Sequence, residues 1–221
     1  KLQKLISKLE KHHKKKLDLS LGRTFNLLKK LGDPQDKLKN VITVVGTNAK
    51  ASMCYSLKSI LNQAGYKTNL YTSPHLLSYT ERYVLDDKEI NEEDLIELLT
   101  GVEKTLGDDN ATLFEILTCA FLKHAENFKD NVNIVEAGLF HQFDSTNVFK
   151  ENLMTLIGVI HNDHFQWLEN KSIEGVIYEK TAKLLNSNIF INKQVNNEIR
   201  DKIEKSLEKN ASNKYFFGKD F

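Results

Sequence analysis

The sequence predicts an α/β fold, a three-layer and mostly parallel sheet of the phosphate-loop type with helices on both faces. Three observations carry this prediction. Short, nearly continuous apolar runs alternate with segments of helical spacing, which is typical of parallel strands buried on both faces. Helix-start residues precede some of the helical segments. A glycine-containing loop joins the first apolar run to the helix that follows it.

Residues 1–40 are predicted to be helical. Leucine and isoleucine recur at positions 2, 5, 6 and 9, a spacing that lines one face of a helix. A second helical segment, from Thr24 to Leu31, stops at the chain-breaking sequence Gly32-Asp33-Pro34.

The run VITVV, from Val41 to Val45, is β-branched throughout and predicts a buried strand. The loop GTNAKAS follows it, and then Met53 to Ala64 has helical spacing and is closed by Gly65. A second strand, KTNLYTS, leads into the turn SPHL.

The second half of the chain continues the alternation. Asn91 is a candidate N-cap because acids fill the turn after it. Two more helices and three more strands are expected over Thr112–His124, Ser172–Leu185, Val132–Leu139, Leu153–Ile160 and Asn188–Asn192. The last residues, YFFGKDF, suit a further sheet element and end abruptly, so we expect residues 1–221 to be one incomplete domain.

Composition narrows the function classes. The net charge of +1 gives no basic footprint for nucleic acid or a membrane surface. The cluster KHHKKK, at positions 11–16, is interpreted as a solvated face or turn. The two lone cysteines, Cys54 and Cys119, indicate a reducing compartment, and no apolar run approaches the length of a membrane helix. We therefore expect a cytoplasmic, monomeric protein without nucleic-acid or membrane partners.

Four polar stretches follow predicted strands: GTNAKAS, TSPHL, EAGLFHQFDSTN and HNDH. In a parallel α/β sheet, ligands collect at the carboxyl ends of the strands. These stretches are therefore expected to converge on one edge of the fold and to form a site there.

The loop GTNAKAS has the outline of a phosphate-binding loop. Backbone N–H groups at the start of the following helix favour an anion, Lys50 could neutralise phosphates, and the hydroxyl of Ser52 could bind Mg²⁺. The pattern GxxxxGK[ST] is not met, because Ala49 precedes the lysine and Ala51 separates it from the serine. Taken alone, the loop fits a nucleotide site or an ordinary strand-to-helix turn.

Other polar residues leave similar alternatives open. Glu136, at the end of a strand, could hold Mg²⁺ or be a surface acid. His161 and His164 are three residues apart, but no third zinc ligand at metal-site spacing is evident. Lys180 would ordinarily be a solvated helix lysine.

Seven collinear motifs resemble those of the folylpolyglutamate synthase and dihydrofolate synthase family of the Mur ligase superfamily, from about Leu27 to the C-terminus. GTNAKAS matches the family's GTNGKGS at five of seven positions. The other motifs are AGYKTNLYTSPHLLSYTER, TLFEILT, EAGLFHQFDSTN, NDHFQWL, YEKTAK and YFFGKDF. The resemblance implies a Mur-ligase central-domain-like fold.

The resemblance also implies an activity. In this family ATP phosphorylates a carboxylate of folate or dihydropteroate, and the amine of L-glutamate then displaces phosphate from the acyl phosphate. The cofactors would be ATP and Mg²⁺, and the binding partners would be small molecules. The protein would act in folate biosynthesis and one-carbon metabolism. Such chemistry relies on positioning and charge neutralisation, which explains why the motifs hold lysines and metal ligands.

The family's site residues carry over to positions of this sequence. Those implied for the nucleotide loop are Gly46, Thr47, Asn48, Ala49, Lys50, Ala51 and Ser52. Those implied for the metal are Ser52, Ser73, Glu136 and His164. Those implied for the substrates are Ser73, Pro74, His75, Leu76, Thr112, Phe114, Asp144 and Ser145. Lys50 and Lys180 would be catalytic, and Lys180 falls where the family has a carbamylated lysine.

Three departures from the family pattern bear on activity. Ala49 and Ala51 replace loop glycines, which would permit positive φ and a close approach of backbone to phosphate. Phe140-His141 and Gln142 replace Gly-Gly-Arg, which is expected to bring bulky side chains near the metal and folate. The family's C-terminal part has no counterpart in these 221 residues. The alternative hypothesis is therefore a degenerate, catalytically silent relative, or a fragment, that at most binds a nucleotide or pterin.

Overall fold

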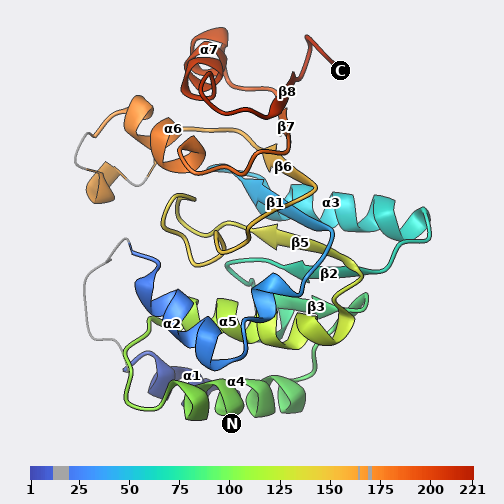
Figure 1. Cartoon of the computed structure of the whole chain (residues 1–221), viewed down its shortest axis with the longest axis vertical. Coiled ribbons are helices and arrows are strands. Elements are labelled where there is room, and N and C mark those ends of the chain that lie inside the picture. Colours follow the sequence, from blue (N-terminus) through green and yellow to red (C-terminus); the bar gives the residue numbers. More distant parts are fainter. Residues whose placement is uncertain (12–19, 164, 169–170) are drawn as a thin grey trace.

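The computed structural model describes residues 1–11, 20–163, 165–168 and 171–221. The described residues form one eight-stranded sheet in the order β4-β3-β2-β5-β1-β6-β7-β8, with the strands one above another from β8 to β3 in Figure 1. The strands are β1 (Val41–Val45), β2 (Thr68–Tyr71), β3 (Tyr83–Leu85), β4 (Lys88–Glu89), β5 (Val132–Glu136), β6 (Met154–Ile157), β7 (Asn188–Ile191) and β8 (Asn213–Phe216).

The sheet is mostly parallel, as predicted. β1 pairs in parallel with β5 on one side and with β6 on the other, with Val44 opposite Glu136 and Val45 opposite Ile157. β2, β7 and β8 continue the parallel pairing outward. At one edge of the described sheet β3 pairs antiparallel with β2, and β4 pairs antiparallel with β3 in a hairpin that the sequence did not predict.

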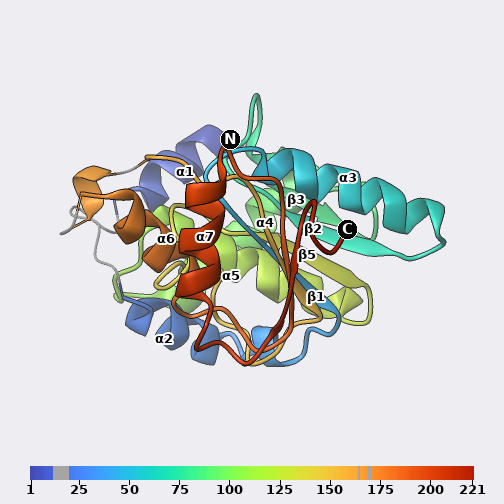
Figure 2. The ribbon, with the colours of Figure 1, turned by 90° about the horizontal axis from the view of Figure 1, so that it is seen from above.

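Helices cover both faces of the sheet. They are α1 (Leu2–Leu9), α2 (Gly22–Lys30), α3 (Lys50–Gln63), α4 (Glu92–Leu106), α5 (Leu113–Ala125), α6 (Ile173–Thr181) and α7 (Asn197–Ser206). Figure 2 shows α3 on one side of the strands and α2, α5, α6 and α7 on the other. Alternation along β1 explains this, because Ile42 and Val44 pack with Cys54 of α3 while Val41 and Val45 join the cores beneath α5 and α6. The predicted three-layer architecture is confirmed.

Local capping explains where several helices begin. Asn91 caps α4, with its Oδ1 accepting from the N–H of Asp94 at 2.8 Å. Thr112 forms a capping box with Glu115 at the start of α5. In the outer layer Leu2, Ile6 and Leu9 of α1 are buried, and α1 packs against α4. The basic cluster predicted to be solvated lies outside the described residues beyond Lys11.

Some element bounds differ from the sequence predictions. α3 begins at Lys50 and not at Met53, because the predicted loop residues 50–52 already form its first turn. β5 ends at Glu136 and β6 at Ile157, where pairing with β1 stops, so both strands are shorter than their apolar runs. α7 was not predicted. In the described part of the chain, none of the helices has the length and apolar character needed to cross a membrane.

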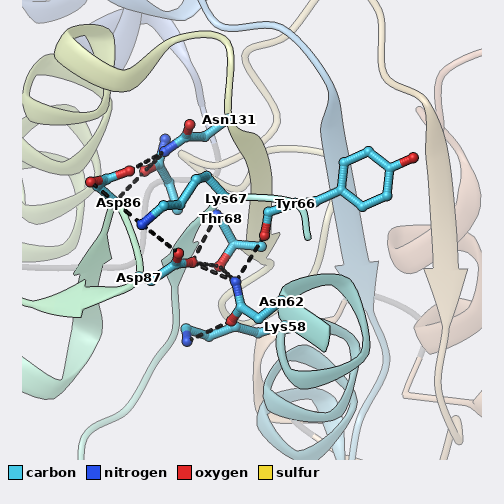
Figure 3. A network of polar contacts seen from close by, with 9 residues as sticks. Lys58, Asn62, Tyr66, Lys67, Thr68, Asp86, Asp87 and Asn131 are labelled. Atoms are coloured by element: carbon cyan, nitrogen blue, oxygen red, sulfur yellow. Dashed lines mark hydrogen bonds and ion pairs between the residues drawn. The ribbon is translucent and has the colours of Figure 1, made fainter. Parts of the chain in front are cut away.

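A polar network ties α3 to the sheet at the edge opposite the carboxyl ends of the parallel strands (Figure 3). Asp87, in the turn between β3 and β4, accepts hydrogen bonds from the backbone and side chain of Thr68 and from Asn62. Burial opposes ionisation, but these hydrogen bonds prevail and lower the pKa of Asp87 to about 2. Lys67 forms ion pairs with Asp86 and Asp87 at 3.9 and 3.2 Å. The network therefore stabilises the edge of the sheet that lies opposite the carboxyl ends of the parallel strands.

Candidate functional site

The carboxyl ends of four neighbouring strands meet at one edge of the sheet. β2, β5, β1 and β6 stand next to one another in that order and are all parallel. The stretches GTNAKAS, TSPHL, EAGLFHQFDSTN and HNDH follow these strands. The predicted convergence is therefore confirmed for the described residues. We call residues 46–52 the phosphate loop and residues 137–147 the β5 loop.

Close backbone packing holds the start of the phosphate loop. Gly46 has a φ of +154°, and a Cβ there would come within 3.2 Å of the Cα of Gly158, just beyond β6. The N–H groups of Thr47 and Asn48 donate to the carbonyl oxygen of Val159 at 2.9 and 3.4 Å. The phosphate loop is thereby pinned to the chain that follows β6.

The side chain of Thr47 strengthens the same attachment. Its Oγ1 accepts from the backbone N–H of His161 at 3.1 Å and lies 3.4 Å from the carbonyl oxygen of that residue. Asn48 is exposed. Thr47 was predicted as a nucleotide residue, and its hydroxyl here connects two of the converging loops.

The second half of the loop turns into a helix at Ala49. Ala49 has left-handed geometry, with φ 63° and ψ 10°, and precedes the first helical residue, Lys50. The N–H groups at a helix start lack intrahelical acceptors, so those of Lys50, Ala51 and Ser52 are available to an anion. Ser52 is exposed in this turn.

One expectation about the loop alanines is wrong. Positive φ was expected at both replaced glycines, but it occurs only at Ala49. Ala51 is the second residue of α3 and has no need of glycine's conformational freedom. Only Ala49 therefore carries the backbone strain of a side chain in the left-handed region.

Lys50, Glu136 and Ser73 come together at the mouth of the loop. The Nζ of Lys50 lies 3.9 Å from Oε1 of Glu136 and 3.4 Å from the carbonyl oxygen of Thr47. The other oxygen of Glu136, Oε2, accepts from the backbone N–H of Ser73 at 3.0 Å. The start of α3, the end of β5 and the segment after β2 thus contribute one group each to a single cluster.

Glu136 is an unusual acid. It is 2% exposed, and this burial raises its pKa to about 7, while the Ser73 N–H and the charge of Lys50 act in the opposite direction. The interpretation of Glu136 as a surface acid is therefore wrong. A carboxylate offers the kind of oxygen ligand that Mg²⁺ prefers.

Lys180 is also buried and belongs to the same cluster. Its side chain, from the last turn of α6, donates from Nζ to the carbonyl oxygens of Gly46 and Leu139 at 2.9 and 3.1 Å. Burial, followed by the charge of Lys50, lowers its pKa to about 7. The interpretation of Lys180 as a solvated helix lysine is wrong.

Two predicted substrate residues lie at the start of α5. Thr112 is its N-cap, with the hydroxyl accepting from the N–H of Glu115 at 3.2 Å. The ring of Phe114 stacks on that of Tyr71, with centroids 6.2 Å apart. Phe114 also lies against Gly138, where an added Cβ would come within 2.7 Å of the ring. The glycine thus allows the β5 loop to approach this aromatic side chain.

Asp144 and Ser145 fold into the β5 loop. Asp144 accepts hydrogen bonds from the N–H groups of Gly138 and Thr146 at 3.1 and 3.0 Å, and burial raises its pKa. The hydroxyl of Ser145 shares a hydrogen bond of 2.9 Å with Thr118. Both residues shape the loop next to Phe114, and their predicted contact with a pterin stays a prediction.

The TSPHL turn is held by residues that the sequence reasoning did not assign. Glu81 accepts hydrogen bonds from the backbone N–H groups of positions 76, 77 and 78 at 2.7–2.8 Å. Arg82 donates to Nδ1 of His75 at 3.0 Å. Pro74 is exposed after a cis peptide bond with Ser73. The pattern Ser-x-x-Glu at positions 78–81, a capping box, was the available signal for Glu81.

The bulky residues that replace the family's Gly-Gly-Arg point away from open space. Phe140 is 2% exposed and joins the core beneath α6 and α7. His141 and Gln142 are buried, and their N–H groups donate to the carbonyl oxygen of Glu179 at 3.2 and 3.0 Å. These residues were expected to crowd the metal and folate. In the structure the centroid of the Phe140 ring lies 5.5 Å from the Nζ of Lys180.

The predicted metal residues are only partly described. His164 lies outside the described residues. Among the residues that are described, no three His, Cys, Asp or Glu side chains gather as a metal site would require. Ser52, Ser73 and Glu136 offer hydroxyl and carboxylate oxygens, which suit Mg²⁺ better than zinc.

The fold and the site together define a class: a mostly parallel α/β fold in which the loop from β1 to α3 lies at a topological switch point, since β1 stands between β5 and β6. Known proteins agree. The chain is 36% identical over 163 residues to a dihydrofolate synthase/folylpolyglutamate synthase of Escherichia coli K12. The aligned region covers 74% of this chain and 38% of the relative. No protein-family model matches the chain.

Solved structures give the same result. E. coli FolC in complex with DHPP and ADP has a TM-score of 0.87 at 30% identity, covering 99% of this chain and 51% of FolC. A bifunctional folylpolyglutamate synthase/dihydrofolate synthase of Yersinia pestis, complexed with AMPPNP and Mn ion, has a TM-score of 0.85 at 28% identity, covering 97% and 51%. Over the part that it spans, the chain belongs to the dihydrofolate synthase/folylpolyglutamate synthase family. It spans about half the length of these solved relatives.

Proposed function

We propose that this chain forms the nucleotide- and folate-binding part of an ATP-dependent ligase that adds L-glutamate to folate or to dihydropteroate. One observation carries the proposal: a helix N-terminus, Lys50 and the buried Glu136 meet at the carboxyl edge of the sheet. That set suits a polyphosphate with its divalent cation. The E. coli relative was solved with ADP and the Yersinia relative with AMPPNP and Mn.

The proposed reaction has two steps. A carboxylate oxygen of the folate attacks the γ-phosphorus of ATP and ADP leaves, which gives an acyl phosphate. The amine of glutamate then attacks the acyl carbon, phosphate leaves, and the amine loses a proton. Bound Mg²⁺ would neutralise phosphate charge during the first step.

The residues of this chain would bind and orient the reactants. The N–H groups of the first turn of α3 and the ammonium of Lys50 would bind the β- and γ-phosphates. Glu136, Ser52 and Ser73 would hold Mg²⁺ directly or through water. Phe114, Asp144 and Ser145 would bind the pterin, and the turn at positions 73–76 would border both substrates.

A silent relative that binds nucleotide without turnover is the second candidate. The observation that favours it is the left-handed geometry of Ala49, whose Cβ strains the loop and would lie near bound phosphates. The relatives' remaining half would also be needed for whole-enzyme activity.

Glutamate-dependent release of ADP, with tetrahydrofolate or dihydropteroate as acceptor, separates the two candidates. Turnover that Lys50→Ala abolishes establishes the ligase. Binding of Mg·ATP without ADP release establishes the silent relative. Absence of both binding and release contradicts the proposed function.

A further inference from the structure

Gln194 is a buried amide side chain just after β7, at the carboxyl edge of the sheet. It is 8% exposed, and backbone groups hold both ends of its amide. Its Oε1 accepts from the N–H of Ile160 at 3.0 Å, and its Nε2 donates to the carbonyl oxygens of Gly158 and Asn192 at 3.2 and 2.8 Å. The acceptor and both donor hydrogens of the amide are therefore used.

The amide of Gln194 takes the place of a partner strand beyond the end of β6. The register of β6 with β7 ends at Ile157. In parallel pairing, one residue bonds two backbone groups that lie two residues apart on the neighbouring strand. Gln194 makes that pair of bonds with its side chain, to the carbonyl oxygen of Gly158 and the N–H of Ile160. The chain on both sides of Val159 is therefore held as if the sheet continued.

The backbone groups that Gln194 bonds are shielded from solvent. Gly158 and Ile160 are both buried. Buried backbone groups are nearly always paired, because an unpaired one gives up its hydrogen bond to water without a replacement. Without the amide of Gln194, residues 158–161 would have to open to water or move. We call residues 158–161 the β6 segment.

The β6 segment in turn holds the phosphate loop. The carbonyl oxygen of Val159 accepts the N–H groups of Thr47 and Asn48 at 2.9 and 3.4 Å. The N–H of His161 donates to Oγ1 of Thr47 at 3.1 Å. Gln194 thus stands behind the β6 segment and supports the backbone that bonds the phosphate loop.

We propose that Gln194 is a positioning residue for the nucleotide: its amide fixes the β6 segment, and the β6 segment fixes the backbone of the phosphate loop. The coupling between Gln194 and the phosphate loop stands on the contacts alone. Its consequence for Mg·ATP affinity rests on the proposed function.

Amide exchange resolved by residue tests the coupling. Gln194→Met removes the amide and keeps an unbranched side chain of similar length. The amide of Ile160, which Gln194 bonds directly, is expected to exchange about tenfold faster or more. The amides of Thr47 and Asn48, which bond only to the β6 segment, are expected to accelerate by a similar factor.

Asn152→Leu is the matched control, because it removes a comparable amide at the opposite end of β6. Asn152 is half-buried, and its Nδ2 donates to three oxygens of β1 and β6 at 2.9–3.2 Å. The control therefore loses as many hydrogen bonds on the same strand, but none near the phosphate loop. We expect it to leave the exchange of residues 47, 48 and 160 unchanged.

Two exchange results would overturn the proposal. Acceleration at Ile160 alone, with Thr47 and Asn48 unchanged, would confine Gln194 to its immediate neighbours. Equal acceleration of these amides in Asn152→Leu would reduce the effect to a general loss of stability.

Mg·ATP affinity, measured by calorimetry on the same samples, tests the positioning role. It is expected to fall at least tenfold in Gln194→Met and less than twofold in Asn152→Leu. Affinity that Gln194→Met leaves unchanged would overturn that role. A wild-type chain that binds no Mg·ATP counts against the proposed function, and the exchange result still decides the coupling.

The wild-type chain provides a test that needs no variant, in case Gln194→Met does not fold. Measured over a range of denaturant concentrations, the amides of Thr47 and Ile160 are expected to share one opening free energy, because they open as a unit. Opening of Thr47 about tenfold or more often than that of Ile160 would overturn the coupling.

Discussion

Replacing Ala49 by glycine is expected to stabilise the protein, although alanine-to-glycine changes usually destabilise. Ala49 has a φ of 63°, and an L-residue with a Cβ costs roughly 1–2 kcal/mol in that region. Glycine removes this strain, but it also lowers the stability by about 0.4–1 kcal/mol because it gives the unfolded chain more conformational entropy. The net expectation is about 0.5–1 kcal/mol of added stability.

Ala51→Gly is the matched control. The substitution is the same and lies two residues away, but Ala51 is in the first turn of α3 with helical geometry. Glycine within a helix costs up to about 1 kcal/mol relative to alanine. The two variants should therefore differ by about 1–2 kcal/mol with opposite signs, or roughly 2–8 °C in Tm for a chain of this size.

Urea unfolding followed by circular dichroism measures the difference. The midpoint should rise for Ala49→Gly and fall for Ala51→Gly, with the same slope for both variants because the surface exposed on unfolding does not change. If Ala49→Gly were as destabilising as Ala51→Gly, the left-handed geometry at residue 49 would be refuted, and with it the reasoning about strain in the loop.

Three further predictions follow from other parts of the structure. Gly138→Ala should lower stability by about 1–3 kcal/mol in thermal melts, because the added Cβ would lie 2.6 Å from Oδ2 of Asp144; an unchanged Tm would contradict this. The pKa of Glu136 is about 7 in the folded protein and 4.5 as the ordinary value, so the folded state binds the proton more tightly. The free energy of unfolding therefore falls as the pH rises from about 4.5 to about 7, because the buried carboxyl group loses its proton. Glu136→Gln should thus gain up to about 3 kcal/mol at pH 8 and nothing at pH 4, and equal gains at both would count against the burial. The pKa of Asp87 is about 2 in the folded protein, below its ordinary value of 3.8, so its carboxylate should contribute up to about 2 kcal/mol to the free energy of unfolding. This contribution should disappear as the pH falls from about 4 to 2. If Asp87→Ala still lowered the stability by the same amount below pH 2, the linkage would be refuted.

The sequence predicted the layered fold because its strongest signals are local. The apolar run at Val41–Val45 and the candidate N-cap Asn91 indicate the kind of element without any tertiary information. The hairpin β3–β4 was missed because its strands are three and two residues long, too short for a periodic pattern. α7 was missed although Asn196 caps it, because its apolar face is narrow.

The candidate site was predictable as a set of loops but not as a set of contacts. Adjacency of β2, β5, β1 and β6 brings the motifs together, and the strand-loop-helix pattern anticipated that adjacency. Burial of Glu136 and Lys180 could not be predicted, because both side chains would be ordinary surface groups at a strand end or in a helix. Ala49 and Ala51 could not be distinguished either, since each replaces a glycine in the same motif and only the folded backbone places positive φ at Ala49 alone of the two.

Calorimetric titration with Mg·ATP tests the central claim, that the edge formed by the four loops is a nucleotide site, most directly. The wild-type chain is expected to bind weakly, Ala49→Gly to bind more tightly, and Lys50→Ala to lose binding. Micromolar binding by the wild type that neither substitution changes would contradict the claim.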